Sequence, residues 1–269
     1  MKIAFCFSGE IRDIEKSYPF FKTLINKFSP DIFLSTWDTE NPQVGDTIHN
    51  FKEKYNPLIC EVENWKAWKS QYSSTIIPYY QTPKDPVLRL NPKEEKQAES
   101  IVRFAQWYKI QRANYLTKMV NNNYDIVVKL RTDLILKDDF FLFKNDSLNF
   151  SVGKMILPAW GNIEGPHDYV FYGKPQYMDY ATNLFYFISH YHREGQCIHP
   201  PENLLRHHLS QQDISLRFYN FQVMLRGNNA IQTYPDQPFN FYTSHSSRNW
   251  KQPIPNSKLS FYKDEVNIT

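Results

Sequence analysis

Residues 2–38 read "KIAFCFSGEIRDIEKSYPFFKTLINKFSPDIFLSTWD", and their pattern indicates a strand, a helix and a second strand. The apolar run "KIAFCFSG" predicts a first strand that is buried on both faces and ends in a Ser8-Gly9 turn. Residues 10–28 carry apolar side chains at helical spacing, with Pro19 as a kink or a boundary. A Ser-Pro turn then leads into "DIFLSTWD". This order is the βαβ unit of a parallel sheet.

The rest of the chain continues the alternation of strands and helices. One strand is expected in "LICEVENW" (residues 58–65), and the clearest helix begins after Pro92 and ends at the Asn run 121–123. Its buried face is predicted to consist of Ile101, Phe104, Tyr108, Ala113, Tyr115 and Met119. Further elements are expected in order along the chain: a strand in 124–140, strands in 154–160 and 168–173, helices in 174–191 and 200–212, and a strand pair around 216–227. No linker separates independent domains, so a single α/β domain with a mostly parallel sheet is expected over residues 1–269.

Composition limits the classes of protein that fit. Of 269 residues, 41% are hydrophobic and 16% aromatic, which favours a packed core over disorder. A net charge of +3 is too small to indicate nucleic-acid binding, although it suits a small anionic ligand. The three cysteines lack CxxC spacing, so neither a disulfide framework nor a zinc site is expected. Without a signal-like segment or an apolar run long enough for a transmembrane helix, a soluble, cytoplasmic protein is predicted.

Two charged residues interrupt the most apolar part of the chain, "YDIVVKLRTDLILKDDF" (residues 124–140). Burying Arg131 or Asp133 without a partner would cost several kcal/mol, as a rough estimate. In a strand these two side chains share a face, and Thr132 points the other way. They either form an internal ion pair or face a ligand: the arginine a diphosphate, the carboxylate Mg²⁺, Mn²⁺ or a sugar hydroxyl.

Other polar residues follow the ends of predicted parallel strands, where open α/β sheets bind their ligands. Ser8, Gly9 and Arg12 follow the first strand, and backbone amides beside an arginine suit a phosphate or a nucleobase edge. The alternative is an ordinary turn with a surface arginine. Asp38 ends the second strand and is expected either to accept hydrogen bonds from a base or ribose, or to cap a helix.

Three residues in the second half of the chain are candidates for chemistry. Asp168 precedes a predicted strand, and Glu202 lies in the first turn of a predicted helix, where the helix dipole favours a carboxylate. Glu202 is either a general base or simply part of a well-formed helix start. His245, in "FYTSHSS", either closes over a bound metal or is solvated.

In these motifs the chain resembles the GT-A-like glycosyltransferases of surface-polysaccharide and lipopolysaccharide synthesis, a group found in bacteria and large DNA viruses. The resemblance rests on "FCFSGEIRD", "PDIFLSTWD", "YDIVVKLRTDLIL", "DYVFYGKPQYM" and "PENLLRHHL", which follow one another from residue 1 to about 210. It implies a Rossmann-like GT-A domain, with residues 1–140 as the nucleotide-sugar half and 141–269 as the acceptor half and C-terminal tail. The chain is then expected in the cytoplasm, or in the host cytoplasm if it is viral.

The resemblance also implies roles for individual residues. The nucleotide-sugar donor would contact Ser8, Gly9, Arg12, Asp38, Arg131 and Asp133. The last two stand where the family carries Asp-x-Asp, which holds a divalent metal on the diphosphate, and the arginine replaces the first aspartate. Mn²⁺ or Mg²⁺ on Asp133, with His245, is therefore one expectation, and neutralisation of the diphosphate by Arg131 itself is the other. Glu202 matches the acidic residue that serves as base in inverting members, although Asn203 replaces the usual aspartate after it; Asp168 is the second candidate.

The activity implied is transfer of a sugar from a nucleoside-diphosphate sugar to a hydroxyl group of a glycan acceptor by direct displacement. Two other classes compete with it. A sugar nucleotidyltransferase should carry a Gly-rich phosphate loop with a lysine after the first strand, whereas "SGEIRD" has one glycine and no lysine. A non-catalytic carbohydrate-binding protein would usually be all-β, whereas this chain opens with a βαβ order.

Overall fold

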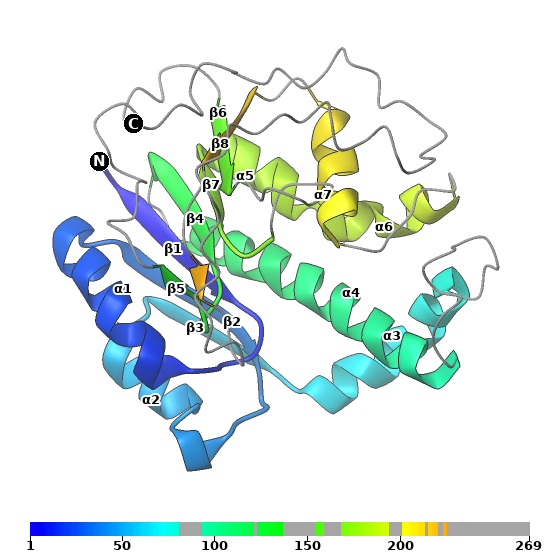
Figure 1. The fold of residues 1–269 in the computed structure, drawn as a ribbon, viewed down its shortest axis with the longest axis horizontal. Coiled ribbons are helices and arrows are strands. Elements are labelled where there is room, and N and C mark those ends of the chain that lie inside the picture. The colour runs from blue at the N-terminus through cyan, green and yellow to red at the C-terminus, as the bar shows by residue number, and fades with distance from the viewer. Residues whose placement is uncertain are drawn as a thin grey trace.

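A seven-stranded sheet forms the centre of the molecule in the computed structural model, in the strand order β3-β2-β1-β4-β7-β6-β8 (Figure 1). The structure describes residues 1–80, 93–120, 123–136, 154–158, 168–193, 201–212, 215–219 and 223–224. The strands of this sheet are β1 (Ile3–Ser8), β2 (Asp31–Trp37), β3 (Ile59–Glu63), β4 (Ile126–Leu130), β6 (Lys154–Pro158), β7 (Phe171–Gly173) and β8 (Ser215–Tyr219).

Within the described sheet, β7 alone runs against the other strands. Strands β3, β2, β1 and β4 are mutually parallel, β7 is antiparallel to both β4 and β6, and β8 is parallel to β6. The prediction of a mostly parallel α/β sheet is therefore confirmed. Because β7 is reversed, its first residues lie at the same edge of the sheet as the carboxyl end of β4.

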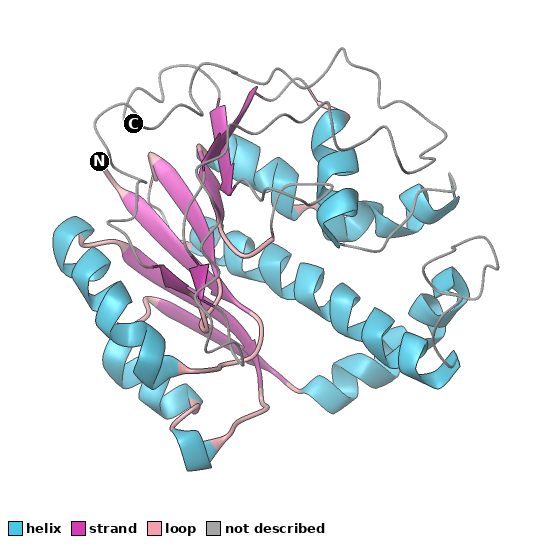
Figure 2. Cartoon of the chain, viewed as in Figure 1, coloured by secondary structure: helices cyan, strands magenta, loops and turns pink. Residues whose placement is uncertain are grey.

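Helices cover both faces of the sheet, as Figure 2 shows. They are α1 (Ile14–Phe28), α2 (Ile48–Tyr55), α3 (Trp65–Tyr80), α4 (Lys93–Leu116), α5 (Pro175–Thr182), α6 (Leu184–Arg193) and α7 (Pro201–Ser210), with short 3₁₀ turns η1 (Pro42–Val44) and η3 (Thr117–Met119). One face packs on α1 and α2, and the other on α4 and its neighbours α5, α6 and α7. No helix in the described part of the chain is both long enough and apolar enough to cross a bilayer.

Strand β1 shows why both layers form. Its side chains alternate between the two faces, so that Ala4 and Cys6 join the core under α4, whereas Phe5 and Phe7 join the core under α1 and α2. The ring of Phe7 packs edge-on against Phe21 of α1, with 5.0 Å between centroids. A strand that is apolar on both faces can be buried only between two helical layers.

The strand order reverses beside β1. The chain goes from β1 through α1 to β2 on one side of β1, and β4 is reached later through α4 and pairs with β1 on the other side. In open α/β sheets, ligands bind outside the carboxyl ends of the strands at such a reversal. The segments after Ser8 and after Leu130 therefore lie at the position that this fold class uses for binding.

The structure corrects several predicted boundaries. Strand β4 ends at Leu130, so residues 131–133 lie in a turn, and β5 (Ile135–Leu136) belongs to a separate small sheet with β9 (Val223–Met224). The expected strand pair around 216–227 is thus wrong, because β8 pairs with β6 and β9 with β5. Helix α1 begins only at Ile14 and continues through Pro19.

Helix predictions needed correction in two further places. The helix predicted at 174–191 is two helices, α5 and α6, which meet at Asn183. On α4, Ile101, Phe104 and Ala113 are buried as predicted and Tyr108 is partly buried, but Tyr115 and Met119 are exposed. The buried face of α4 is instead completed by Trp107, Ile110 and Leu116. The sequence pattern did not reveal this buried face, because the polar residues Lys109 and Asn114 are also buried on α4 and interrupt the apolar spacing.

Candidate functional site

The loop after β1 is fixed by its backbone hydrogen bonds. Gly9 adopts a positive φ of 96°, which favours glycine, and its N–H donates to the carbonyl of Ser35 on β2 at 3.1 Å. The N–H of Ile14, at the start of α1, donates to the buried carboxylate of Asp46 at 3.1 Å. These two amides already have partners within the protein. A contact of Ser8 and Gly9 with the donor stays a prediction.

Thr132 joins the loop after β1 to the turn after β4. Its Oγ1 accepts a hydrogen bond from the N–H of Arg12 at 3.1 Å and donates one to the carbonyl of Glu10 at 2.9 Å. The Arg12 guanidinium forms an ion pair with the Glu10 carboxylate. The ends of β1 and β4 are thus connected through side chains as well as through the sheet.

Arg131 and Asp133 form a two-point ion pair in the turn after β4. Arg131 Nε donates to Asp133 Oδ1 at 2.8 Å, and Nη2 donates to Oδ2 at 2.7 Å. The Asp133 side chain is 2% exposed and that of Arg131 is 25% exposed. Burial opposes ionisation of Asp133, but the charge and hydrogen bonds of Arg131, with a smaller contribution from Arg12, hold the pKa of Asp133 below its ordinary value. Of the two alternatives, the structure shows the internal ion pair.

The reversed strand β7 brings Asp168 and Tyr169 to the sheet edge at which β4 ends. Lys129 of β4 pairs with Phe171, so the residues just before β7 lie beside the turn after β4. The Arg131 guanidinium lies 5.2 Å from the centre of the Tyr169 ring, a cation–π contact. Asp168 is 1% exposed, and its Oδ2 has no hydrogen-bond partner among the described residues. A buried carboxylate oxygen without a partner is costly, which makes it a candidate contact for a ligand hydroxyl.

Lys129 holds this segment against β4. Its buried ammonium group donates to the backbone carbonyl of Asp168 and to that of Tyr169, the latter at 3.3 Å. Burial lowers the pKa of Lys129 to about 7, and the negative charge of Asp168 opposes that shift. Lys129 was not among the predicted site residues, although it is, like Arg131, a charged residue within the same apolar run. Thr132 was missed because a threonine in a strand carries no such signal.

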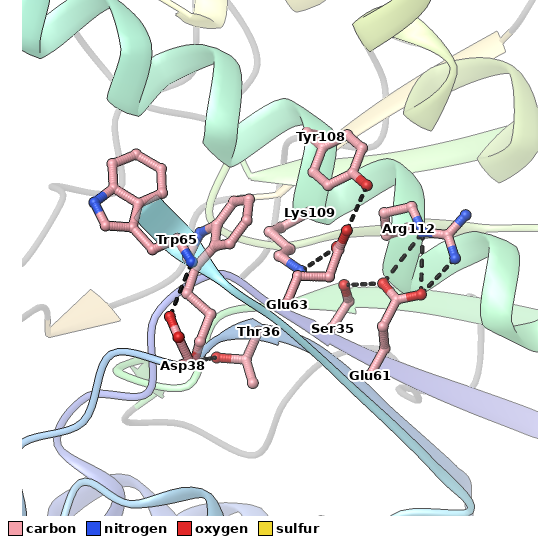
Figure 3. Close-up of polar contacts among 10 residues, drawn as sticks. Ser35, Thr36, Asp38, Glu61, Glu63, Trp65, Tyr108, Lys109 and Arg112 are labelled. Carbon is pink, nitrogen blue, oxygen red and sulfur yellow. Dashed lines mark hydrogen bonds and ion pairs between the residues drawn. The ribbon is translucent and has the colours of Figure 1, made fainter. Parts of the chain in front are cut away.

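Asp38 caps a helix, which was one of its two predicted roles. Its Oδ1 accepts from the N–H of Trp65, the first residue of α3, at 2.9 Å (Figure 3). Its Oδ2 accepts from the Asn64 side chain at 2.5 Å. The carboxylate therefore caps α3 across the sheet edge. A contact with a nucleotide stays a prediction, and it would have to coexist with this cap.

A second polar cluster lies next to the cap, between β3 and α4. Glu63 accepts from the Tyr108 hydroxyl at 2.8 Å and from the Lys109 ammonium at 2.5 Å, and these residues are drawn in Figure 3. Glu61 accepts from Ser35 at 2.8 Å and pairs with the Arg112 guanidinium. Burial lowers the pKa of Lys109, and the hydrogen bond that Lys109 donates to Glu63 opposes this effect. Since each charge shown has a partner, this cluster joins α4 to the edge strand and needs no ligand.

The remaining predicted residues are placed only in part. Ser8 is buried at the end of β1. Glu202 lies in the first turn of α7, as predicted, and α7 packs against α5 and α6. His245 lies outside the described residues.

Asp133, the predicted metal ligand, is engaged with Arg131. Each of its carboxylate oxygens accepts one hydrogen bond from that guanidinium and keeps a further lone pair. Among the described residues, no group of three or more His, Cys, Asp or Glu is arranged to hold a metal ion. Involvement of Mn²⁺ or Mg²⁺ stays a prediction.

Searches against protein-family models and against curated protein sequences find no match for this chain.

Proposed function

We propose that this protein is a glycosyltransferase of the GT-A type, which moves a sugar from a nucleoside-diphosphate sugar to a hydroxyl group of a glycan. The observation that carries the proposal is that the loop carrying Arg12 and the turn carrying Arg131 lie together at the reversal of a mostly parallel sheet, where the Thr132 hydroxyl bonds to the loop. Two arginines at this position suit a diphosphate, because guanidinium groups bind phosphate oxygens in a two-point geometry.

Arg131 is proposed to serve as the main electrostatic contact for the diphosphate. Its pairing with Asp133 uses Nε and Nη2, and a quarter of its side chain remains exposed. As the bond between the sugar and the diphosphate breaks, negative charge develops on the leaving diphosphate. A fixed guanidinium beside that position stabilises the transition state more than the ground state.

The acceptor hydroxyl needs a base, and Asp168 and Glu202 are the two candidates. Asp168 is favoured because its unpartnered oxygen lies at the sheet edge, near Arg131. The base takes the proton of the acceptor hydroxyl while the hydroxyl oxygen bonds to the anomeric carbon. The bond from that carbon to the diphosphate oxygen breaks, and the nucleoside diphosphate leaves with the electron pair.

Binding of the donor is tested by a thermal-shift panel of UDP-, GDP-, CMP- and dTDP-sugars, each with Mn²⁺ or with EDTA. The decisive variant is Asp133→Asn, which keeps the shape of the side chain and removes its charge. If Arg131 binds the diphosphate, this variant binds the donor several-fold tighter in EDTA, because the competing carboxylate is gone. If Asp133 holds a metal, the variant loses the effect of Mn²⁺. Asp179→Asn, which alters a carboxylate of α5 that pairs with Lys118 of η3, is the control.

Turnover separates the competing functions. A transferase hydrolyses its donor slowly without acceptor, a nucleotidyltransferase releases pyrophosphate from a nucleoside triphosphate and a sugar 1-phosphate, and a binding protein leaves both mixtures intact. Asp168→Asn and Glu202→Gln compare the two candidate bases: the base is the residue whose loss abolishes transfer and preserves donor binding. If no nucleotide sugar shifts the melting temperature of the wild type, the proposed function is wrong.

A further inference from the structure

Thr132 is the only described side chain shown to bond the loop after β1 to the turn after β4. It is 2% exposed, and its hydroxyl both accepts from the Arg12 N–H and donates to the Glu10 carbonyl. The two bonds span 120 and 122 positions of the chain. One hydroxyl group therefore adds a direct bond between two segments that already follow paired strands.

The position of Thr132 in its turn couples it to the ion pair. Thr132 stands between Arg131 and Asp133 in the chain. Its hydroxyl bonds to the loop after β1, whereas its two neighbours form the ion pair at the candidate site. Arg12 lies close enough to Asp133 to lower the pKa of that carboxyl group. Any shift of Thr132 relative to Arg12 would therefore change the spacing of the two guanidinium groups.

The other end of the loop is anchored independently. The N–H of Ile14 donates to Asp46. Asp13, which lies between Arg12 and Ile14, adopts a left-handed backbone conformation with a φ of 49°. A residue other than glycine in this conformation is strained and needs support from its surroundings. Arg12 thus lies in a short segment held at residue 12 by Thr132 and at residue 14 by Asp46.

We propose that Thr132 is a positioning residue, which sets the Arg12 guanidinium beside Arg131 so that both bind one diphosphate group. This inference rests on the proposed function, because it names the residue that assembles the diphosphate site. A hydroxyl with both an acceptor and a donor role is required, so serine can replace threonine and valine cannot.

The test uses Thr132→Val, which keeps the shape and loses both hydrogen bonds, and Thr132→Ser, which keeps the hydroxyl. Thr182→Val is the matched control, because Thr182 is also buried and donates to a carbonyl within α5 at 2.8 Å, away from the site. Hydrogen exchange at the Arg12 amide reports the contact itself. Calorimetric titration with inorganic pyrophosphate in EDTA reports the spacing of the two arginines, and circular dichroism checks the fold.

We expect Thr132→Val to expose the Arg12 amide to exchange and to weaken pyrophosphate binding about tenfold or more, the effect of losing one well-placed charged contact. Thr132→Ser should retain both the protection of the Arg12 amide and the affinity for pyrophosphate, and Thr182→Val should change neither quantity. If Thr132→Val does not fold, Gly9→Ala gives a second route. No atom lies within 4 Å of the added Cβ, but the φ of 96° at residue 9 disfavours alanine. This variant should also weaken pyrophosphate binding.

Two results would overturn the inference, and they differ. Loss of Arg12 amide protection with unchanged pyrophosphate affinity would show that Thr132 is structural only. A wild type that does not bind pyrophosphate or any nucleotide sugar, with the Arg12 amide still protected by Thr132, would instead reject the proposed function on which the inference rests.

Discussion

The Arg131–Asp133 pair shows how much one turn can depend on two side chains. Both charges lie at the end of an apolar strand, and each satisfies the other. Breaking a buried pair from one side leaves an uncompensated charge, whereas replacing both partners removes the need for either. The pair is therefore expected to be strongly coupled, in contrast to the more exposed Arg12–Glu10 pair.

We expect Arg131→Gln to lower the free energy of unfolding by about 2–3 kcal/mol, since Arg131 is partly exposed and the full buried-pair cost does not apply. The double variant Arg131→Gln/Asp133→Asn should be less destabilised than the sum of the single variants. Glu10→Gln should cost less than about 1 kcal/mol, as for other exposed pairs. Urea denaturation of the set measures the coupling, and additive single effects would contradict it.

His208 is a buried histidine whose partners determine its tautomer. Its Nε2 lies 2.7 Å from the carbonyl of Tyr180, so that nitrogen donates, and Nδ1 accepts from the Tyr191 hydroxyl at 2.7 Å. Burial lowers the pKa of His208 to about 4 from 6.5. The neutral ring is thus part of the packing between α5, α6 and α7.

Because the unfolded chain binds this proton near pH 6.5 and the folded chain only near pH 4, stability should fall as the pH drops through that window. The loss at pH 4 is up to about 3 kcal/mol. His208→Gln should flatten the pH dependence of the unfolding free energy between pH 4 and 6.5. The exposed His190→Gln serves as the control. An equal slope in wild type and His208→Gln would count against the assignment.

At the scale of elements, α3 begins where the end of β2 provides a cap. Helix α3 starts next to the carboxylate of Asp38, which belongs to another element, and Asn64 accepts from the N–H of Ala67 at 2.7 Å. The start of α3 is therefore fixed by tertiary contact as well as by its own residues. The same is true of α1, whose first N–H is held by Asp46.

Asp38→Ala should lower stability by about 1 kcal/mol, the usual cost of losing a helix cap, because the Trp65 N–H loses its acceptor. Asp38→Asn should cost less, since the amide oxygen still accepts. Thr47→Ala, which removes the side-chain cap of α2, provides a comparison of similar size. Thermal unfolding measures all three, and hydrogen exchange at Trp65 reports the local effect. A stability of Asp38→Ala equal to wild type would show that the cap contributes nothing.

For the whole molecule, the pH dependence of stability depends on groups buried at the sheet. Lys129 lies between β4 and the segment before β7, and its pKa is lowered from 10.5 to about 7 by burial, against the charge of Asp168. Between these values the unfolded chain binds the proton and the folded chain does not. Stability is therefore expected to rise as the pH increases from 7 towards 10.5.

Lys129→Met should reduce this rise by a few kcal/mol. Burial raises the pKa of Cys6, whose thiol ionises in this range only in the unfolded chain and so adds a slope of its own. The quantity to compare is therefore the difference between wild type and variant over pH 7–9.5. Lys16→Met, which alters an exposed lysine of α1, is the control. Chemical denaturation along this pH series measures the effect, and parallel curves for wild type and Lys129→Met would disprove it.

The elements of the fold were largely predictable because they depend on local patterns. The two-sided burial of β1 follows from a continuous apolar run, and the long helix α4 follows from the spacing of its apolar residues, although it ends at Leu116 and not at the Asn run. Helices α2 and α3 were not predicted, because residues 39–91 are rich in Pro, Asn and aromatic side chains without a clear period. The cap from Asp38 that starts α3 is not a local signal.

The candidate site was predictable in its location and not in its contacts. Polar residues after apolar strands marked the ends of β1 and β4, since a charge in an apolar run demands an explanation. Whether Arg131 meets Asp133 or a ligand, and whether Asp38 faces a nucleotide or caps α3, depends on groups brought close by folding.

The alternation of strands and helices, the mostly parallel sheet and the strand ends that carry polar groups could be predicted from the amino-acid sequence, because periodicity and burial act over a few residues. The strand order, the reversal of β7 and the bonding of Thr132 to a loop 120 positions away emerge only in the folded molecule. The physical reason is that a hydrogen bond or an ion pair requires atoms within about 3 Å, and the chain meets that condition only after its layers have packed.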